Sequence, residues 1–300
     1  MNINPNRYYG AFPILATPFC EDESVDYESL RSLVRFQLEA KVHGIAMFGM
    51  ASEVYTLTAS EKDRVFSIVK EEVNGKVPLI VGTSHTSMAG AIALSKEAEK
   101  DGANALMIMP PSMAKPDGKR LYEYYAGIAK NVNIPIMIQD APVASGVNLP
   151  TSTIAQLCKE FETVQYIKVE APPTIMKITE VLDATQGDIT VFGGMNAVFM
   201  FEEFERGSVG TMPACEFPAL TVAIFEAYRS GDVQKAREMF VRHLPLFRMG
   251  TIPGYAMAIH KEILRQLGVT RTGCVRNPNA PLHPSLQADV DLLIKELAIL

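Results

Sequence analysis

The chain has 300 residues, of which 48% are hydrophobic and 21% are charged, and its formal net charge at pH 7 is -6. This composition is typical of a globular protein with enough apolar side chains for a large core. A negative charge without a basic run argues against a nucleic-acid partner or an anionic membrane surface. No apolar run reaches the roughly 18 residues that a membrane-spanning helix needs.

The cysteines and histidines give no sign of a disulfide framework or a metal site. Cys20, Cys158, Cys215 and Cys274 lie far apart without CxxC spacing, and the five histidines lack a ligand pattern such as HExxH. We expect no signal peptide. The pattern therefore predicts reduced thiols, a cytoplasmic location, no metal and no cofactor.

Short apolar runs recur along the first 218 residues and predict buried β-strands. They begin near residues 11, 45, 78, 104, 135, 164, 189 and 208. Helical patterns separate them and often end at a glycine, as at Gly44, Gly102 and Gly187. The sequence Thr58-Ala-Ser-Glu61 fits the capping box of one such helix.

The character of these runs predicts a closed parallel sheet. Strands that are apolar throughout, rather than alternating, are typical of parallel sheets with both faces covered. Eight βα units without the GxGxxG motif of dinucleotide-binding folds favour a (β/α)8 barrel over residues 1–218. Helical patterns over 219–230, 232–248, 254–267 and 284–300 then predict a barrel-completing helix and a C-terminal helical extension within residues 219–300.

One predicted strand carries a lysine near its end, where an apolar strand least favours a charge. Tyr166, Ile167 and Val169 surround Lys168, and prolines stop the run at residue 172. Desolvation favours the neutral amine, which attacks carbonyl carbons; alternatively, the ammonium reaches solvent from the strand end. Because active sites of such barrels lie at the C-terminal ends of the strands, we favour Lys168 as a Schiff-base nucleophile.

The same rule selects further candidates at the ends of other strands. Gln139 and Asp140 are the polar pair assigned to catalysis beside Lys168, although an aspartate before Ala-Pro is equally typical of a turn. Ser52 is a candidate to bind a substrate carboxylate, or it caps a helix, and Glu53 is expected to brace that loop.

A second group of candidates is assigned to substrate binding. His85 is either a polar substrate contact or a structural histidine. The glycine pair ending at Gly194 leaves room for a substrate or simply turns the chain into the next helix. The full set of predicted substrate-binding residues is Gly49, Ala51, Ser52, Glu53, His85, Ser112, Gly194, Asn196 and Met212.

Over nearly its whole length the chain resembles the dihydrodipicolinate synthase and N-acetylneuraminate lyase family of Schiff-base (β/α)8 enzymes. The residues that carry the resemblance are Phe12-Pro-Ile-Leu-Ala-Thr-Pro-Phe19, the loop Gly49 to Glu53, Tyr166-Ile-Lys168, Gly194 and Gly207-Ser-Val-Gly210. Met50 and Ala51 replace the two hydroxyl residues of the family's Gly-Thr-Thr-Gly-Glu loop. Ser112 stands where many members have a tyrosine, and Gln139 stands where the catalytic tyrosine is expected.

In the segments that differ from this family pattern, the chain resembles the L-2-keto-3-deoxyarabonate dehydratase branch of the family. The segments concerned are Ile136 to Pro142, Ser52-Glu53 and Ile167 to Glu170. The resemblance implies a small-molecule 2-keto-3-deoxy sugar acid as substrate, no metal and a homotetramer.

We therefore predict a Schiff-base lyase that dehydrates a 2-keto acid. Retro-aldol cleavage needs a base on the C4 hydroxyl, and the amide of Gln139 transfers no proton near neutral pH. Proton transfer then falls to Lys168, Asp140, Ser112 or bound water. The alternatives are an aldolase or synthase of the same family and a catalytically inactive paralogue that binds keto acids.

Overall fold

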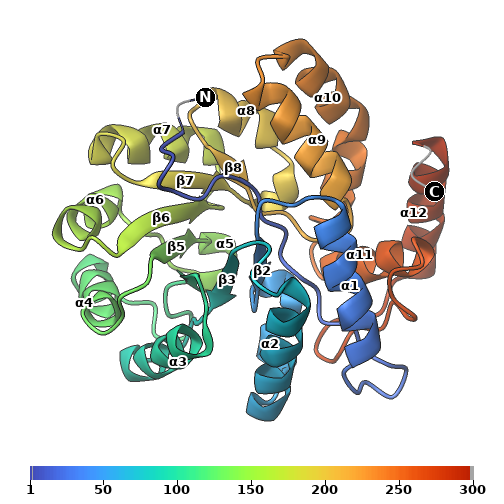
Figure 1. Ribbon diagram of the computed structural model, residues 1–300, viewed down its shortest axis with the longest axis horizontal. Helices are drawn as coiled ribbons and strands as arrows, with labels where there is room; N and C mark the ends of the chain where they lie inside the picture. Colours follow the sequence, from blue (N-terminus) through green and yellow to red (C-terminus); the bar gives the residue numbers. More distant parts are fainter. Residues whose placement is uncertain (2, 298–300) are drawn as a thin grey trace. The chain divides into compact units, whose positions relative to one another are not determined.

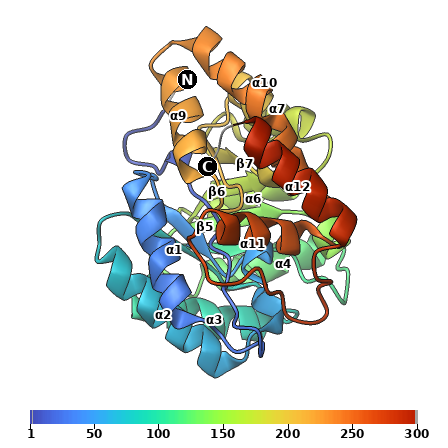
Figure 2. The same cartoon turned by 90° about the vertical axis from the view of Figure 1, so that its right-hand side faces the viewer.

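The structure, a computed structural model, describes residue 1 and residues 3–297. The chain forms two compact units, each of which we describe by itself. Unit 1 contains residues 1–9 and 78–212, and unit 2 contains residues 10–77 and 213–300. Figures 1 and 2 show the helices and strands in two views.

Unit 1 is a succession of parallel strands and helices. Its strands are β3 (Leu79–Gly82), β4 (Ala105–Ile108), β5 (Ile136–Asp140), β6 (Val164–Val169), β7 (Thr190–Gly193) and β8 (Gly210–Thr211). Its helices are α3 (Met88–Asp101), α4 (Gly118–Ala129), α5 (Pro142–Ser145), α6 (Thr151–Glu160), α7 (Thr174–Thr185), the 3-10 turn η3 (Met195–Ala197) and α8 (Met200–Glu205). Each strand pairs in parallel with the next one along the chain.

The strands of unit 1 are buried because both of their faces carry apolar side chains. Every residue of β4 and β5 is buried, as is every residue of β6 except Gln165. Helices α3, α4, α6 and α7 lie outside this sheet and pack beside one another in chain order (Figure 1). The continuous apolar runs of the sequence thus predicted the strands correctly.

Unit 2 combines the first two strands with most of the remaining helices. Its elements are β1 (Gly10–Ala11), α1 (Tyr27–Glu39), β2 (Ile45–Met47), the 3-10 turns η1 (Met50–Ser52) and η2 (Val54–Thr56), α2 (Ala59–Val73), α9 (Pro218–Arg229), α10 (Val233–Met249), α11 (Ala256–Gln266) and α12 (Pro284–Glu296). Helix α1 packs beside α2, and α12 packs against α10 and α11 (Figure 2). Ile14 bridges to both Ala46 and Ala214 within this unit.

Local signals account for several helix ends. The predicted capping box at the start of α2 is confirmed, since Thr58 and Glu61 bond reciprocally to each other's backbone. Gly102 ends α3 in the left-handed conformation at φ 97°. The short helix α5 was not predicted; it starts at Pro142 and ends before Gly146, whose φ is 68°.

The eight predicted strands and the four helices after residue 218 are confirmed. The last helix was predicted to run to residue 300; it ends at Glu296, and residues 298–300 lie outside the described part of the chain. All four cysteines are free thiols. None of the described helices is long and apolar enough to cross a membrane.

Candidate active site

The ends of β5, β6 and β7 lie side by side in unit 1. Their register places Gln139 beside Lys168, and Lys168 beside Phe192. Lys168 is only 4% exposed. The alternative of a lysine that extends into solvent is therefore wrong, because its side chain is buried at the strand end.

Glu170 joins Lys168 to Gln139. Side chains alternate along a strand, so Lys168 and Glu170 lie on the same face. The Lys168 Nζ lies 3.4 Å from Glu170 Oε1, and the Gln139 amide Nε2 donates to Glu170 Oε2 at 2.8 Å. The backbone N–H of Glu170 donates to the carbonyl oxygen of Asp140 at 2.9 Å. The result is an amine and a carboxylate in one cluster, with an amide that fixes the carboxylate.

Sequence reasoning did not assign a catalytic role to Glu170. The signal was present, because a residue two positions after Lys168 on a strand must share its face. The amide of Gln139 has no useful acid–base chemistry, but Glu170 beside it does. Glu170 is therefore a further candidate for the proton transfer, beside the groups that the sequence indicated.

The turn after β7 packs against Glu170. A Cβ atom on Gly194 would lie 2.3 Å from Glu170 Cγ, so only glycine fits there. Met195, Asn196 and Ala197 follow with φ values of 47°, 51° and 61°. Three successive non-glycine residues in the left-handed region are strained by about 1 kcal/mol or more each, and such strain is found mainly at functional sites.

Met212, directly after β8, contacts the end of β7 through its backbone. Its N–H donates to the carbonyl oxygen of Gly193 at 2.9 Å, and its side chain is buried. The structure therefore brings Gly194, Asn196 and Met212 together at the end of β7. Among them, Gly194 touches the carboxylate cluster directly.

Asp140 lies on the opposite face of β5 from Gln139, because the two are adjacent in a strand. Its charged partner is Lys177 of α7, whose Nζ lies 3.5 Å from Asp140 Oδ2 and also donates to the carbonyl oxygen of Leu149 at 2.7 Å. Burial raises the pKa of the Asp140 carboxyl, and Lys177 opposes that rise. None of the described contacts of Asp140 joins its side chain to Lys168. The described contacts give it an ion pair with Lys177, and its catalytic role stays a prediction.

His85 and Ser112 lie on the loops that follow β3 and β4 in unit 1. His85 is exposed, and its Nδ1 accepts from the backbone N–H of Ser87 at 3.0 Å just before α3. Its backbone carbonyl oxygen accepts from the hydroxyl of Tyr124 at 2.9 Å. These contacts favour the structural alternative for His85. Ser112 is half-buried beside the exposed Met113.

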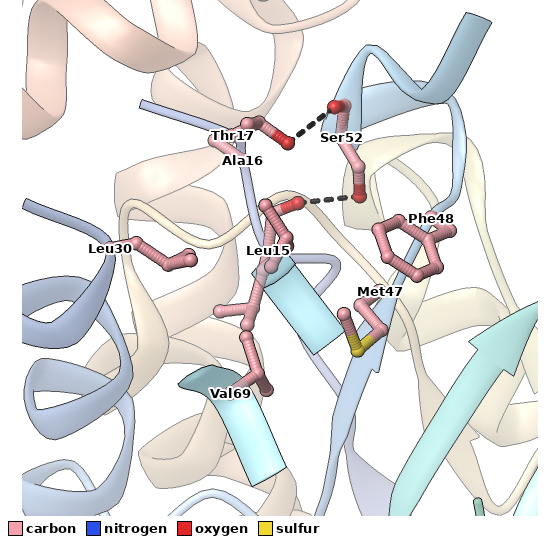
Figure 3. A pocket seen from close by; sticks show the side chains of 9 residues that line it. Leu15, Ala16, Thr17, Leu30, Met47, Phe48, Ser52 and Val69 are labelled. Carbon is pink, nitrogen blue, oxygen red and sulfur yellow. Dashed lines mark hydrogen bonds between the residues drawn. The ribbon is translucent and has the colours of Figure 1, made fainter. Parts of the chain in front are cut away.

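The second group of predicted site residues lies in unit 2. Gly49 is buried and Ala51 is half-buried on the turn η1. The Ser52 hydroxyl donates to the carbonyl oxygen of Leu15 at 2.6 Å, and the Ser52 carbonyl oxygen accepts from Thr17 at 2.7 Å (Figure 3). The gap beside them leaves no room for a water molecule. A substrate carboxylate therefore binds the Ser52 hydroxyl only if the bond to Leu15 breaks.

Glu53 anchors the loop that follows β2 through a buried ion pair. It is fully buried at φ 51° and forms an ion pair with Lys261 of α11. The backbone N–H of Arg276 and the amide of Asn279 donate to Glu53 Oε2 at 3.1 and 2.6 Å. Lys261 Nζ also lies 3.9 Å from the ring centre of Phe19. These are the contacts of a residue that braces the loop.

Replacing Lys261 by methionine is expected to lower the free energy of unfolding by about 3 kcal/mol, because it leaves the Glu53 carboxylate buried without its counter-ion. The expected loss is at the lower end of the range for such changes, since Arg276 and Asn279 still donate to Glu53. Urea unfolding followed by circular dichroism measures it. Lys76→Met, on an exposed loop, is the control. Equal midpoints for the two variants would show that the pair contributes nothing.

No group of three or more His, Cys, Asp or Glu side chains within the described residues is arranged to hold a metal ion. The chemistry of the cluster in unit 1 is that of an amine next to a carboxylate. Such a pair forms imines and moves protons with its own side chains.

Comparisons with known proteins show the family to which the chain belongs. Residues 7–297 match the Dihydrodipicolinate synthetase family. L-2-keto-3-deoxyarabonate dehydratase of Azospirillum brasilense is 31% identical over 299 residues, which cover 97% of this chain and 95% of that protein. A 4-hydroxy-tetrahydrodipicolinate synthase of Methanopyrus kandleri is 36% identical over 291 residues, covering 96% and 95%.

A solved structure extends the comparison to the fold. The dihydrodipicolinate synthase from Thermotoga maritima matches with a TM-score of 0.92 and 29% identity, and the match covers 98% of this chain and 99% of that one. The predicted (β/α)8 fold class is thereby confirmed. The chain belongs to the dihydrodipicolinate synthetase family of lyases, as the resemblance of its sequence indicated.

Proposed function

We propose that this protein is a Schiff-base lyase that removes water from a 2-keto-3-deoxy sugar acid. The observation that carries the proposal is the cluster at the ends of β5 and β6, where a buried lysine lies 3.4 Å from a carboxylate that a glutamine amide holds in place. One relative of this chain is named as a dehydratase of such an acid.

The first part of the reaction is the work of Lys168. Its neutral amine attacks the C2 carbonyl carbon of the substrate, and the adduct takes up one proton from solvent and loses water, which gives a protonated imine. This imine withdraws electrons from C3 and makes the C3 proton acidic. The substrate is then held covalently, with C3 two bonds from the nitrogen.

Glu170 performs the proton transfers of the second part. As a carboxylate beside Nζ it takes the C3 proton, which converts the imine to an enamine. The enamine then expels the C4 hydroxyl, and the proton now on Glu170 leaves with it as water. One carboxyl group thus acts first as base and then as acid, and the imine is restored with a C3–C4 double bond.

Release of the product returns the lysine. Loss of one C5 proton and of the hydroxyl proton, with protonation of C3 and C4, converts the C5 alcohol to an aldehyde, and water hydrolyses the imine. The overall change is the loss of one water molecule, and a five-carbon substrate gives a 2,5-dioxo acid. No oxidant or reductant is required.

Gln139 supports dehydration over aldol cleavage. Cleavage of the C3–C4 bond needs a base at the C4 hydroxyl, which in enzymes that this chain resembles is a tyrosine at the position of Gln139. An amide cannot accept that proton, but its N–H fixes the carboxylate of Glu170 at 2.8 Å. We therefore assign the base of this site to Glu170, which directly follows the strand that carries Lys168.

Analysis of the products distinguishes this proposal from its alternatives. Incubation with L-2-keto-3-deoxyarabonate is expected to yield 2,5-dioxopentanoate, identified by mass spectrometry, and its stereoisomers serve as competing substrates. Pyruvate together with an aldehyde would instead identify an aldolase. Formation of 4-hydroxy-tetrahydrodipicolinate in a synthase assay would assign the activity for which other relatives are named. Binding of keto acids without any turnover would identify an inactive paralogue.

As part of the same proposal, we expect the enzyme to act in the cytoplasm as a homotetramer. Light scattering coupled to size-exclusion chromatography tests the assembly. A mass near four times 32.9 kDa supports it, and a mass near 32.9 kDa rejects it.

A further inference from the structure

A second carboxyl group lies close to the proposed site, on the opposite face of the end of β7 from Glu170. Glu203 of α8 is 0% exposed. Its Oε1 accepts from the hydroxyl of Thr174 in α7 at 2.7 Å, and its Oε2 has no hydrogen-bond partner among the described residues. The proposed reaction does not use this group, and a fully buried carboxyl with one neutral partner calls for an explanation.

Glu203 and Glu170 lie on opposite faces of the same two glycines. A Cβ atom on Gly193 would lie 1.8 Å from Glu203 Oε2, and a Cβ atom on Gly194 would lie 2.3 Å from Glu170 Cγ. Adjacent residues of an extended chain face opposite ways, which accounts for the arrangement. The end of β7 is therefore held between two glutamate side chains.

The backbone that follows these two glycines is strained. Directly after Gly194 come the three residues with φ between 47° and 61°. The turn is tied to its neighbours by the Gly194 N–H, which donates to the carbonyl oxygen of Val169 at 3.1 Å, and by the Met212 N–H at Gly193. A strained turn persists only where its surroundings hold it. Contact with Glu203 is part of that support.

The surroundings of Glu203 favour its neutral form. Burial raises its pKa to about 8; Thr174 opposes the rise, and the negative charges of Glu170 and Glu202 add to it. Helix α7 faces the carboxyl with Thr174, β7 faces it with Gly193, β6 contributes Glu170, and α8 itself contributes Glu202. Both charged groups that act on it are acidic, so an ionised Glu203 would be buried without a counter-ion.

We propose that Glu203 is a positioning residue, which in its protonated form holds the Gly193–Gly194 turn against Glu170 and on ionisation loosens that turn. The inference rests on the proposed function, in which Glu170 carries the proton. Glu203 touches neither substrate nor lysine, and acts through the turn. It makes the activity of the site depend on a proton that the reaction itself does not consume.

The variant Glu203→Gln tests this role, because glutamine has the size of the neutral acid and cannot ionise. At pH 7 we expect its kcat to lie within about twofold of the parent's, since the neutral shape is kept. The parent's kcat is expected to fall as the pH rises through about 8, and the fall in the variant is expected to begin at least about one pH unit higher. Glu205→Gln, on the same helix and exposed, is the matched control and should retain the parent's profile.

Thermal unfolding without substrate gives a readout independent of the reaction. A carboxyl whose pKa is raised from 4.5 to about 8 in the folded state stabilises fully below 4.5, and this contribution is lost as the pH rises through 8. The Tm of Glu203→Gln minus that of the parent should therefore increase between pH 5 and pH 8. Such an increase, in a protein that turns over no keto acid, would support the buried proton and reject the proposed function. Parallel Tm curves and identical alkaline limbs in parent and variant would overturn the role of Glu203 and leave the lysine chemistry untouched.

Discussion

Replacing Lys168 by methionine is expected to lower kcat/KM for the 2-keto-3-deoxy acid by at least about 10⁴-fold, since loss of the covalent nucleophile of a serine protease costs about 10⁶ in kcat. Methionine has a similar length and fills the buried space without an amine. Without the imine, only the neutral C2 carbonyl withdraws electrons from C3, so the C3 proton is much less acidic and a carboxylate removes it far more slowly. Turnover of L-2-keto-3-deoxyarabonate, followed by product formation, measures the loss.

The control for this variant is Lys119→Met, on the exposed face of α4. It removes the same charge from unit 1 and should keep the parent's kcat/KM. Circular dichroism and Tm establish that both variants fold. A folded Lys168→Met variant with more than a tenth of the parent's activity would show that catalysis needs no imine at this residue.

The second large effect is expected from Glu170→Gln, which should lower kcat by about 10³-fold, within the range for loss of a general acid–base group. Glutamine keeps the size of the side chain and a hydrogen bond to Gln139, but it neither accepts the C3 proton nor delivers one to the leaving hydroxyl. Imine formation at Lys168 should survive. The variant is therefore expected to bind and trap a keto acid while turning it over slowly.

Glu162→Gln is the matched control, an exposed glutamate just before β6. It should have the parent's kcat. An undiminished kcat in Glu170→Gln would move the proton transfer to another group. Loss of imine formation together with kcat would instead assign Glu170 to positioning the lysine.

Local patterns explain why the strands and Lys168 were predictable. An apolar run with glycine or proline at its ends needs no distant partner to be recognised. A lysine within such a run is unusual by itself. The conclusion that it lies at an active site needed only the general rule on where barrel strands end.

The side chains around it are harder to predict. Gln139 and Asp140 are adjacent in sequence, but adjacent residues of a strand place their side chains on opposite faces. The spacing of Lys168 and Glu170 places them on one face. A residue at the end of a strand can therefore be assigned to the site only if the face of the strand that carries its side chain is also considered.

Other features depend on residues far apart in the chain, and no local pattern contains them. The partners of Glu53 come from α11 and from the loop before α12. Glu202 and Glu203 look alike in sequence, yet one is exposed and the other is fully buried against a glycine of β7. Burial distinguishes them, and burial is a property of the assembled fold.

The central claim is that Lys168 forms an imine with a 2-keto acid, and reductive trapping tests it most directly. The protein is incubated with pyruvate and sodium borohydride, digested, and analysed by mass spectrometry, with Lys168→Met treated in parallel. We predict a stable adduct on the peptide that contains Lys168 and none in the variant. An unmodified Lys168 after trapping with pyruvate and with longer 2-keto acids, or an adduct on another lysine that persists in Lys168→Met, would contradict the claim.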